Sequence, residues 1–279
     1  MTQELQLSRE ELLAKYQRLR HAGRELNNKL MKLVTRHALD WAGTQLGIRQ
    51  GGTFVFDDEC EMDVVMDCCI FDYRRNGKSV VQQYLAKSGS RLSADEATIL
   101  KAMHSPRFSI FAVADTTPGL GVTLHDTLRN DRVFVVDVGL GSTAKKGEIM
   151  AGRLISPDGL TMTTGAMQPV GAGAIDEIGD QIDDLFANGS TDLSKLSSKQ
   201  RARFATTVIR ACLNNESTTR VRYADVETII GRSPAAIRRA LSLDSQDSSN
   251  VDFFAGGEPK KPGLIRSLLG PLLPRRYQD

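Results

Sequence analysis

The sequence predicts an α+β protein with three parts: N-terminal helices, a small five-stranded antiparallel β-barrel of SH3-like or OB-like type, and a C-terminal helical module with a flexible tail. Two observations carry this prediction. Helix-capping patterns introduce apolar repeats of helical spacing before residue 106. Five short runs rich in β-branched residues, separated by tight turns, then fill residues 107–168. We therefore expect four units, at 1–105, 106–170, 171–244 and 245–279.

Composition narrows the class of protein without naming an activity. The chain has 279 residues, of which 41% are hydrophobic and 25% charged, as in globular proteins. Its 36 basic and 34 acidic residues nearly balance, so no global field attracts a polyanion. The N-terminus lacks the basic-then-apolar order of a signal peptide, and no apolar run approaches the roughly 18 residues of a membrane span. We expect a cytoplasmic protein with no integral membrane segment and no cofactor.

Residues 8–46 have the pattern of one long helix. Ser8 and Glu11 form a capping box, and apolar residues then recur at alternating steps of four and three, interrupted by Gly23 and His37. This seam predicts either docking on the same chain or a coiled-coil dimer. The expected partner-binding residues are the seam leucines and two leucines of an apolar island in the tail: Leu19, Leu26, Leu30, Leu33, Leu268 and Leu269.

A strand at 53–56, an acidic helix at 57–73, a helix at 79–86 and a capped helix from Ser93 to His104 are expected next. Glu59, Asp63 and Asp67 of the acidic helix share one face, since they are four residues apart. Carboxylates can bind a divalent cation, but a site needs ligands from more than one element. A solvated face, or packing on the basic long helix, is the alternative.

No catalytic residue stands out, so an enzyme stays an open alternative. Cys60, Cys68, Cys69 and Cys212 form no CxxC pair and are expected to be buried thiols. The GLGST run at 139–143 lacks the lysine of a phosphate-binding loop and is interpreted as a hairpin turn.

The barrel is expected to be a meander without helices. Period-two alternation along its strands predicts one inward-facing set: Phe108, Ile110, Val133, Val135, Ile149 and Leu154.

The C-terminal module is expected to be helical at 174–186 and 193–243. From Lys195 to Arg239 the chain has ten basic and three acidic residues, a candidate footprint for phosphates. Residues 223–241 resemble a helix-turn-helix, with a turn glycine followed by a capping serine and a proline. Two ordinary packed helices are the alternative. The predicted nucleic-acid-binding residues are Arg220, Arg222, Arg232, Ser233, Arg238 and Arg239.

Residues 54–168 resemble an uncharacterised family of bacterial proteins, some of which carry a C-terminal SEC-C metal-binding motif. The resemblance rests on D-Y-R, R-F-S and V-F-V-D landmarks: Asp72, Tyr73, Arg74, Arg107, Phe108, Ser109, Val133, Phe134, Val135 and Asp137. This chain lacks the cysteine-rich SEC-C tail, so a zinc-dependent adaptor role does not transfer. The resemblance implies architecture rather than a reaction.

Three functions follow from these patterns. The first is a non-enzymatic bacterial regulatory or adaptor protein that contacts nucleic acid through its basic C-terminal helices. The second is a pure protein–protein adaptor that uses the coiled-coil helix, the barrel and the apolar tail. The third and most remote is a metal-dependent enzyme that uses the acidic helix.

Overall fold

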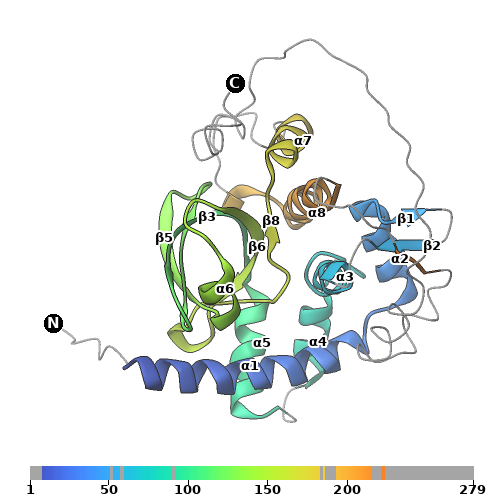
Figure 1. Cartoon of the computed structure of the whole chain (residues 1–279). Helices are drawn as coiled ribbons and strands as arrows, with labels where there is room; N and C mark the ends of the chain where they lie inside the picture. Colours follow the sequence, from blue (N-terminus) through green and yellow to red (C-terminus); the bar gives the residue numbers. More distant parts are fainter. Residues whose placement is uncertain are drawn as a thin grey trace.

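The computed structural model describes residues 8–50, 53–56, 60–88, 92–182, 185, 193–214 and 221–223. It combines helices with antiparallel sheet, as predicted (Figure 1). The helices are α1 (Arg9–Met31), α2 (Arg36–Leu46), α3 (Cys60–Phe71), α4 (Val80–Ser88), α5 (Ala94–His104), α6 (Val138–Thr143), α7 (Ala172–Ile182) and α8 (Ser198–Asn214). The strands are β1 (Arg49–Gln50), β2 (Thr53–Phe56), β3 (Arg107–Thr117), β4 (Gly121–Asp126), β5 (Asp131–Val136), β6 (Ile149–Ile155), β7 (Met162–Thr163), β8 (Gln168–Pro169) and β9 (Val221–Tyr223). In this part of the chain no helix is long and apolar enough to cross a membrane.

The strands β3 to β7 form a curled antiparallel half-barrel in the order β5-β4-β3-β6-β7, with β8 paired to β6 (Figure 1). The expected simple meander is therefore wrong after β5, because β6 returns to pair with β3. A helix also stands where none was expected: Val138–Thr143, which contains the GLGST run, is α6 rather than a hairpin turn. Asp137 caps this helix by accepting the Leu140 N–H at 3.1 Å. The glycine at 141 fits there because a Cβ would lie 2.6 Å from the Gly121 nitrogen.

The single inward-facing set predicted for the sheet divides between two cores. Val135 and Leu154 lie inside the half-barrel, and Val133 packs against the same cluster. Phe108, Ile110 and Ile149 instead face the helices. Five of the six are buried. Alternation could not separate inside from outside here, because helices cover the outer face of β3 and β6 and make both faces apolar.

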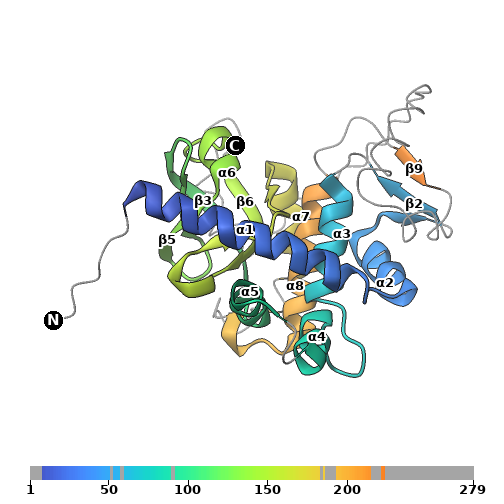
Figure 2. The same cartoon turned by 90° about the horizontal axis from the view of Figure 1, so that it is seen from below.

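The expected single helix over residues 8–46 is wrong, since α1 ends at Met31 and α2 begins at Arg36. Thr35 starts the second helix by accepting the Ala38 N–H at 3.3 Å. The capping box at Ser8 is confirmed, with the Glu11 N–H donated to its hydroxyl at 3.2 Å. Figure 2 shows α1 lying across both the half-barrel and the helical part of the molecule.

The seam of α1 docks on its own chain, which is one of the two predicted outcomes. Leu19, Leu26 and Leu30 are at most 1% exposed and pack with residues of α3, α4 and α5. These three leucines are therefore not available to a partner, and Leu33 is partly buried against the same cluster. A coiled-coil dimer through this face would require the helix to leave its core.

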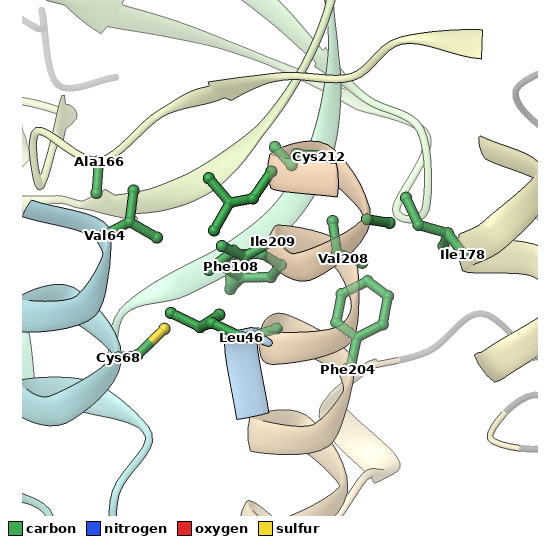
Figure 3. Close-up of a cluster of buried hydrophobic side chains, with 14 of the residues drawn as sticks. Leu46, Val64, Cys68, Phe108, Ala166, Ile178, Phe204, Val208, Ile209 and Cys212 are labelled. Carbon is green, nitrogen blue, oxygen red and sulfur yellow. The ribbon is translucent and has the colours of Figure 1, made fainter. Parts of the chain in front are cut away.

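The largest core joins residues of the first three predicted units. It brings together α2, α3, α7 and α8 with the outer face of β3 and β6. Figure 3 shows Phe108 of the sheet beside Phe204 of α8, with ring centroids 5.7 Å apart. Residues 221–223, expected to be helical, form the strand β9, which pairs with β2. The division into four units remains a prediction, but described residues of the first three units meet in this largest core.

Candidate functional site

The outer face of β4 and β5 is a polar surface on the half-barrel. The strand register places His125 opposite Arg132 and Thr123 opposite Phe134. These side chains alternate with Leu124, which points into the half-barrel. In Figure 1, β5 forms the edge of the half-barrel on the side away from α8. Helices therefore cover the outer face at Phe108 and Ile110 of β3 and along β6, whereas the face is open along β4, β5 and the second half of β3.

Three basic side chains surround a shallow hollow of about 560 Å³ on this face. They are His125, Arg132 and Lys146, and Asp115 is the carboxylate that shares the hollow. No hydrogen bond or ion pair of these three basic side chains occurs among the described residues. Phe134 is 37% exposed, an unusual exposure for a phenylalanine, and lies two residues from Arg132 along the same strand.

The floor of the hollow is formed by small residues of β3. Ala112 lies opposite His125, and the pairing of β3 with β4 shifts register between Val113 and Asp115. A register shift of this kind is a β-bulge, which bends a strand and redirects its side chains. The small side chain of Ala114 and the bulge leave room above the sheet for a ligand that contacts the basic groups.

A buried ion-pair cluster lies between β6 and α3, on the part of the same outer face that helices cover. Arg153 donates from Nε to Asp67 at 2.9 Å and from Nη2 to Asp72 at 2.6 Å. Its guanidinium lies over the ring of Phe71, 4.7 Å from the centroid, and also over Phe108. All three charged side chains are at most 7% exposed. Two carboxylates thus share one guanidinium inside the core.

This cluster shifts the pKa values of its neighbours. Burial raises the pKa of Asp72 to about 6, although Arg153 opposes the shift. Burial, together with the charge of Asp72, also raises the pKa of the Cys68 thiol. Cys68, Cys69 and Cys212 are buried free thiols, as predicted. A thiol with a raised pKa is a poor nucleophile, so Cys68 acts as a packing residue.

No metal site was predicted on the acidic helix, where Glu59, Asp63 and Asp67 were only remote candidates. Asp67 gives one oxygen to Arg153 and accepts the Thr164 hydroxyl at 2.8 Å with the other. Asp63 is exposed, and Glu59 lies outside the described residues. No group of three possible metal-ligating side chains occurs in the part of the chain that the structure describes.

Most of the predicted nucleic-acid residues lie outside the described residues. This holds for Arg220, Arg232, Ser233, Arg238 and Arg239, and for Leu268 and Leu269 of the tail; Arg222 is in β9.

Three other basic residues of this region serve the fold. Arg203 donates to the Gln181 carbonyl of α7 at 2.9 Å, Arg210 bonds the Gln181 side chain, and Arg201 donates to the Leu196 carbonyl. The basic excess of α8 is thus partly structural.

Three of the polar family landmarks make contacts with buried residues at the sheet. Asp72 belongs to the Arg153 cluster, while Arg107 and Ser109 bond the carboxylate of Asp126. The landmarks did not include His125, Arg132 or Lys146. Period-two alternation of polar and apolar residues in GVTLHD and RVFVV was the signal that could have indicated an open outer face.

The fold and these surfaces define an α+β protein in which helices pack against a curled antiparallel half-barrel. The chain belongs to DUF7986, a family of unknown function, whose model matches residues 10–198. The match covers α1 to α7 and extends well beyond the landmarks on both sides. No curated protein and no solved structure matches the chain.

Proposed function

We propose that this is a cytoplasmic bacterial regulatory protein, non-enzymatic, that contacts single-stranded nucleic acid through the outer face of β4 and β5. The observation that carries the proposal is the combination on this face of three basic side chains with the exposed ring of Phe134. The three side chains, of His125, Arg132 and Lys146, form no ion pair with any residue that the structure describes. Basic groups bind phosphates, and an exposed aromatic ring offers a base a stacking surface.

The topology supports this by analogy with a known fold. We interpret the strand order β5-β4-β3-β6-β7, with α6 between β5 and β6, as that of an OB-type barrel. Its edges approach each other, since the Val136 N–H donates to the Thr161 carbonyl at 2.8 Å. OB-folds bind oligonucleotides on the face of their second and third strands, which here are β4 and β5. This is an analogy at the level of the fold.

Charge and stacking variants test the proposal separately. Arg132→Ala with Lys146→Ala removes two phosphate contacts, so the dependence of log K on log salt for a labelled oligothymidylate should fall by about 1.4, or roughly 0.7 per contact. Phe134→Ala should weaken binding by about 1–3 kcal/mol without changing that slope. Fluorescence anisotropy across a salt series measures both quantities.

A matched control removes the same charge elsewhere. Lys87→Ala with Lys101→Ala deletes two exposed lysines from α4 and α5, away from the face. This variant should retain the wild-type slope. Equal loss in both double variants would mean that only net charge matters, which contradicts a site on β4 and β5.

The basic C-terminal segment is a second candidate contact, favoured by its ten basic residues against three acidic ones. Arg238→Ala with Arg239→Ala should reduce the salt slope on duplex DNA by about two, roughly one per lost phosphate contact. An unchanged slope would remove this segment from the interface. If the wild-type protein binds no single strand, duplex or RNA at low salt, the pure protein–protein adaptor is the function that remains.

A further inference from the structure

A second hollow, distinct from the outer face of β4 and β5, lies where α1 crosses α3, α5 and the segment after β7. Its volume is about 380 Å³, and it is lined by residues of these four parts of the chain together with Ile155 of β6 and Met162 and Thr163 of β7. Small-molecule sites in proteins usually measure about 300–1,000 Å³. We call this hollow the α1 cleft.

One wall of the α1 cleft is a continuous stripe of α1. Its residues are spaced three and four apart, so they share one helix face: Arg20, Gly23, Arg24, Asn27, Asn28 and Met31. At a rise of about 1.5 Å per residue the stripe is roughly 16 Å long. It begins with two arginines, continues with two amides and ends with a methionine. The wall therefore changes from cationic to apolar along its length.

The floor of the α1 cleft is apolar and rich in methionine. Four of the eight methionines of the chain line it: Met31, Met66, Met103 and Met162. Ile70 and Ile155 complete the apolar surface. Methionine is flexible and polarisable, and protein surfaces that accept apolar groups of varied shape use it often.

A helix-interior glycine helps to open the α1 cleft. Gly23 interrupts the heptad seam of α1, and a Cβ at this position would lie 3.9 Å from Ile99 Cγ2 of α5. Glycine in the middle of a helix is less stable than alanine. A larger side chain here would project between α1 and α5, so the glycine leaves room for a ligand.

The two arginines at the cationic end of the cleft have no carboxylate partner in the described part of the chain. Arg20 donates from Nη1 to the Thr163 carbonyl at 2.9 Å. Gly165, at φ +106°, leaves room for the Nη2 of Arg20, because a Cβ at this position would lie 3.3 Å from that nitrogen. Neither Arg20 nor Arg24 forms an ion pair within the described residues. Two carboxylates also line the cleft: Asp63, and Asp67, which pairs with Arg153 rather than with Arg20 or Arg24. The positive charge of the cleft is therefore concentrated at the Arg20 and Arg24 end.

We propose that the α1 cleft binds a small organic anion with an apolar body. The carboxylate or phosphate of the ligand lies between Arg20 and Arg24, within reach of the amides of Asn27 and Asn28. Its apolar body lies on the methionine floor. The negative head pairs with guanidinium groups that no carboxylate of the described residues occupies, and the apolar part is removed from water.

Decanoate, decyl phosphate and decanol are the probes, because they share an alkyl chain and differ in the head group. Calorimetry on the full chain should show binding of decanoate or decyl phosphate, with decanol at least about tenfold weaker, since charged hydrogen bonds contribute most. The better of the two anions identifies the head group. Equal binding of all three, or no binding of either anion at millimolar concentration, overturns the proposal.

Variants locate the ligand. Arg24→Ala removes an exposed side chain, so the fold should survive, and it should weaken decanoate about tenfold while leaving decanol unchanged. Lys101→Ala removes an exposed charge of α5 outside the cleft and should change neither ligand. If Arg24→Ala binds decanoate as the wild-type protein does, the cationic end of the cleft is not the site.

Filling the cleft gives the second test. Gly23→Leu should abolish binding of decanoate if circular dichroism and thermal melting show a folded protein. Gly23→Ala is the companion variant, because its Cβ makes an ordinary contact with Ile99. It should raise the melting temperature and retain binding. A folded Gly23→Leu that still binds decanoate contradicts the proposal, and so does a Gly23→Ala that melts higher yet loses decanoate.

Discussion

Asp72 and Asp126 are both buried carboxylates that bond to arginine, yet their pKa values shift in opposite directions. Asp72 is 6% exposed, and burial raises its pKa to about 6. Asp126, the last residue of β4, is fully buried. Burial opposes ionisation there too, but hydrogen bonds from Ser109 and Arg107 outweigh it and lower the pKa of Asp126.

The two sites differ in the number of donors for each carboxylate. Asp126 accepts six hydrogen bonds, three on each oxygen, from Ser109, two backbone N–H groups, Arg107 and Arg129. Asp72 accepts one from Arg153, which it shares with Asp67. Burial of a carboxylate therefore does not fix its charge; the ratio of donors to carboxylates does. Both oxygens of Asp126 are thus saturated with hydrogen-bond donors, whereas the Arg153 cluster has two carboxylates for one guanidinium.

The largest expected effect comes from removing the guanidinium that Asp67 and Asp72 share. Arg153→Met should destabilise the protein by about 3–5 kcal/mol, because it leaves two buried carboxylates without a cation. Urea unfolding at neutral pH measures the change. Adding Asp67→Asn and Asp72→Asn to this variant should recover part of the loss. A triple variant that is no more stable than Arg153→Met would show that shape rather than charge dominates this cluster.

The stability of the wild-type protein relative to Asp72→Asn should be greater in mild acid than at neutral pH. Its folded pKa of about 6 lies above its ordinary value of 3.8, so the folded state binds a proton between these values and the unfolded state does not. Stability relative to Asp72→Asn should therefore rise as pH falls from about 6 to 4. Roughly two pKa units at 1.36 kcal/mol each give up to about 3 kcal/mol. Unfolding of both proteins across this range is the measurement; a constant difference contradicts the shift.

Asp126 should show the opposite pH dependence. Because its folded pKa is lowered, its contribution to stability is complete above the ordinary value of 3.8 and is lost as pH falls through the folded pKa. Asp126→Asn should cost about 2 kcal/mol at neutral pH, within the range for hydrogen bonds to charged groups. The difference from the wild-type protein should shrink below pH 4. A cost that grows in acid would mean that Asp126 resembles Asp72.

The sequence predicted best the features whose partners are close in the chain. Both capping boxes, at Ser8 and Ser93, are confirmed, since donor and acceptor lie three residues apart. The α+β class was also predicted correctly. The break between α1 and α2 was missed, because the apolar spacing runs through it and only Thr35 signals a new helix.

Features that depend on distant pairing could not be predicted. Arg153 lies 81 residues from Asp72, and nothing in the local sequence of β6 indicates a buried ion pair. The landmarks included Asp72 but not its partner. The His125–Arg132 pair of the outer face depends on strand register, and the α1 cleft depends on where α1 crosses α5. Which distant segments come into contact depends on the packing of the whole core rather than on local conformational preference.

The smallest expected effect tests whether the Asp126 site is saturated. Arg129→Ala removes one of six donors, from a side chain that is 32% exposed, so it should cost only about 1 kcal/mol. The pKa of Asp126 should stay below its ordinary value, because Arg107, Ser109 and the backbone N–H groups still bond it. Carbon-13 NMR titration of the Asp126 carboxyl group measures this directly. Arg75→Ala, at an exposed position in the turn before α4, serves as the control. A pKa of Asp126 above 3.8 in Arg129→Ala, but not in the control, would mean that the Arg129 guanidinium alone keeps this pKa low. The difference between Asp126 and Asp72 would then depend on a single charge rather than on the number of donors.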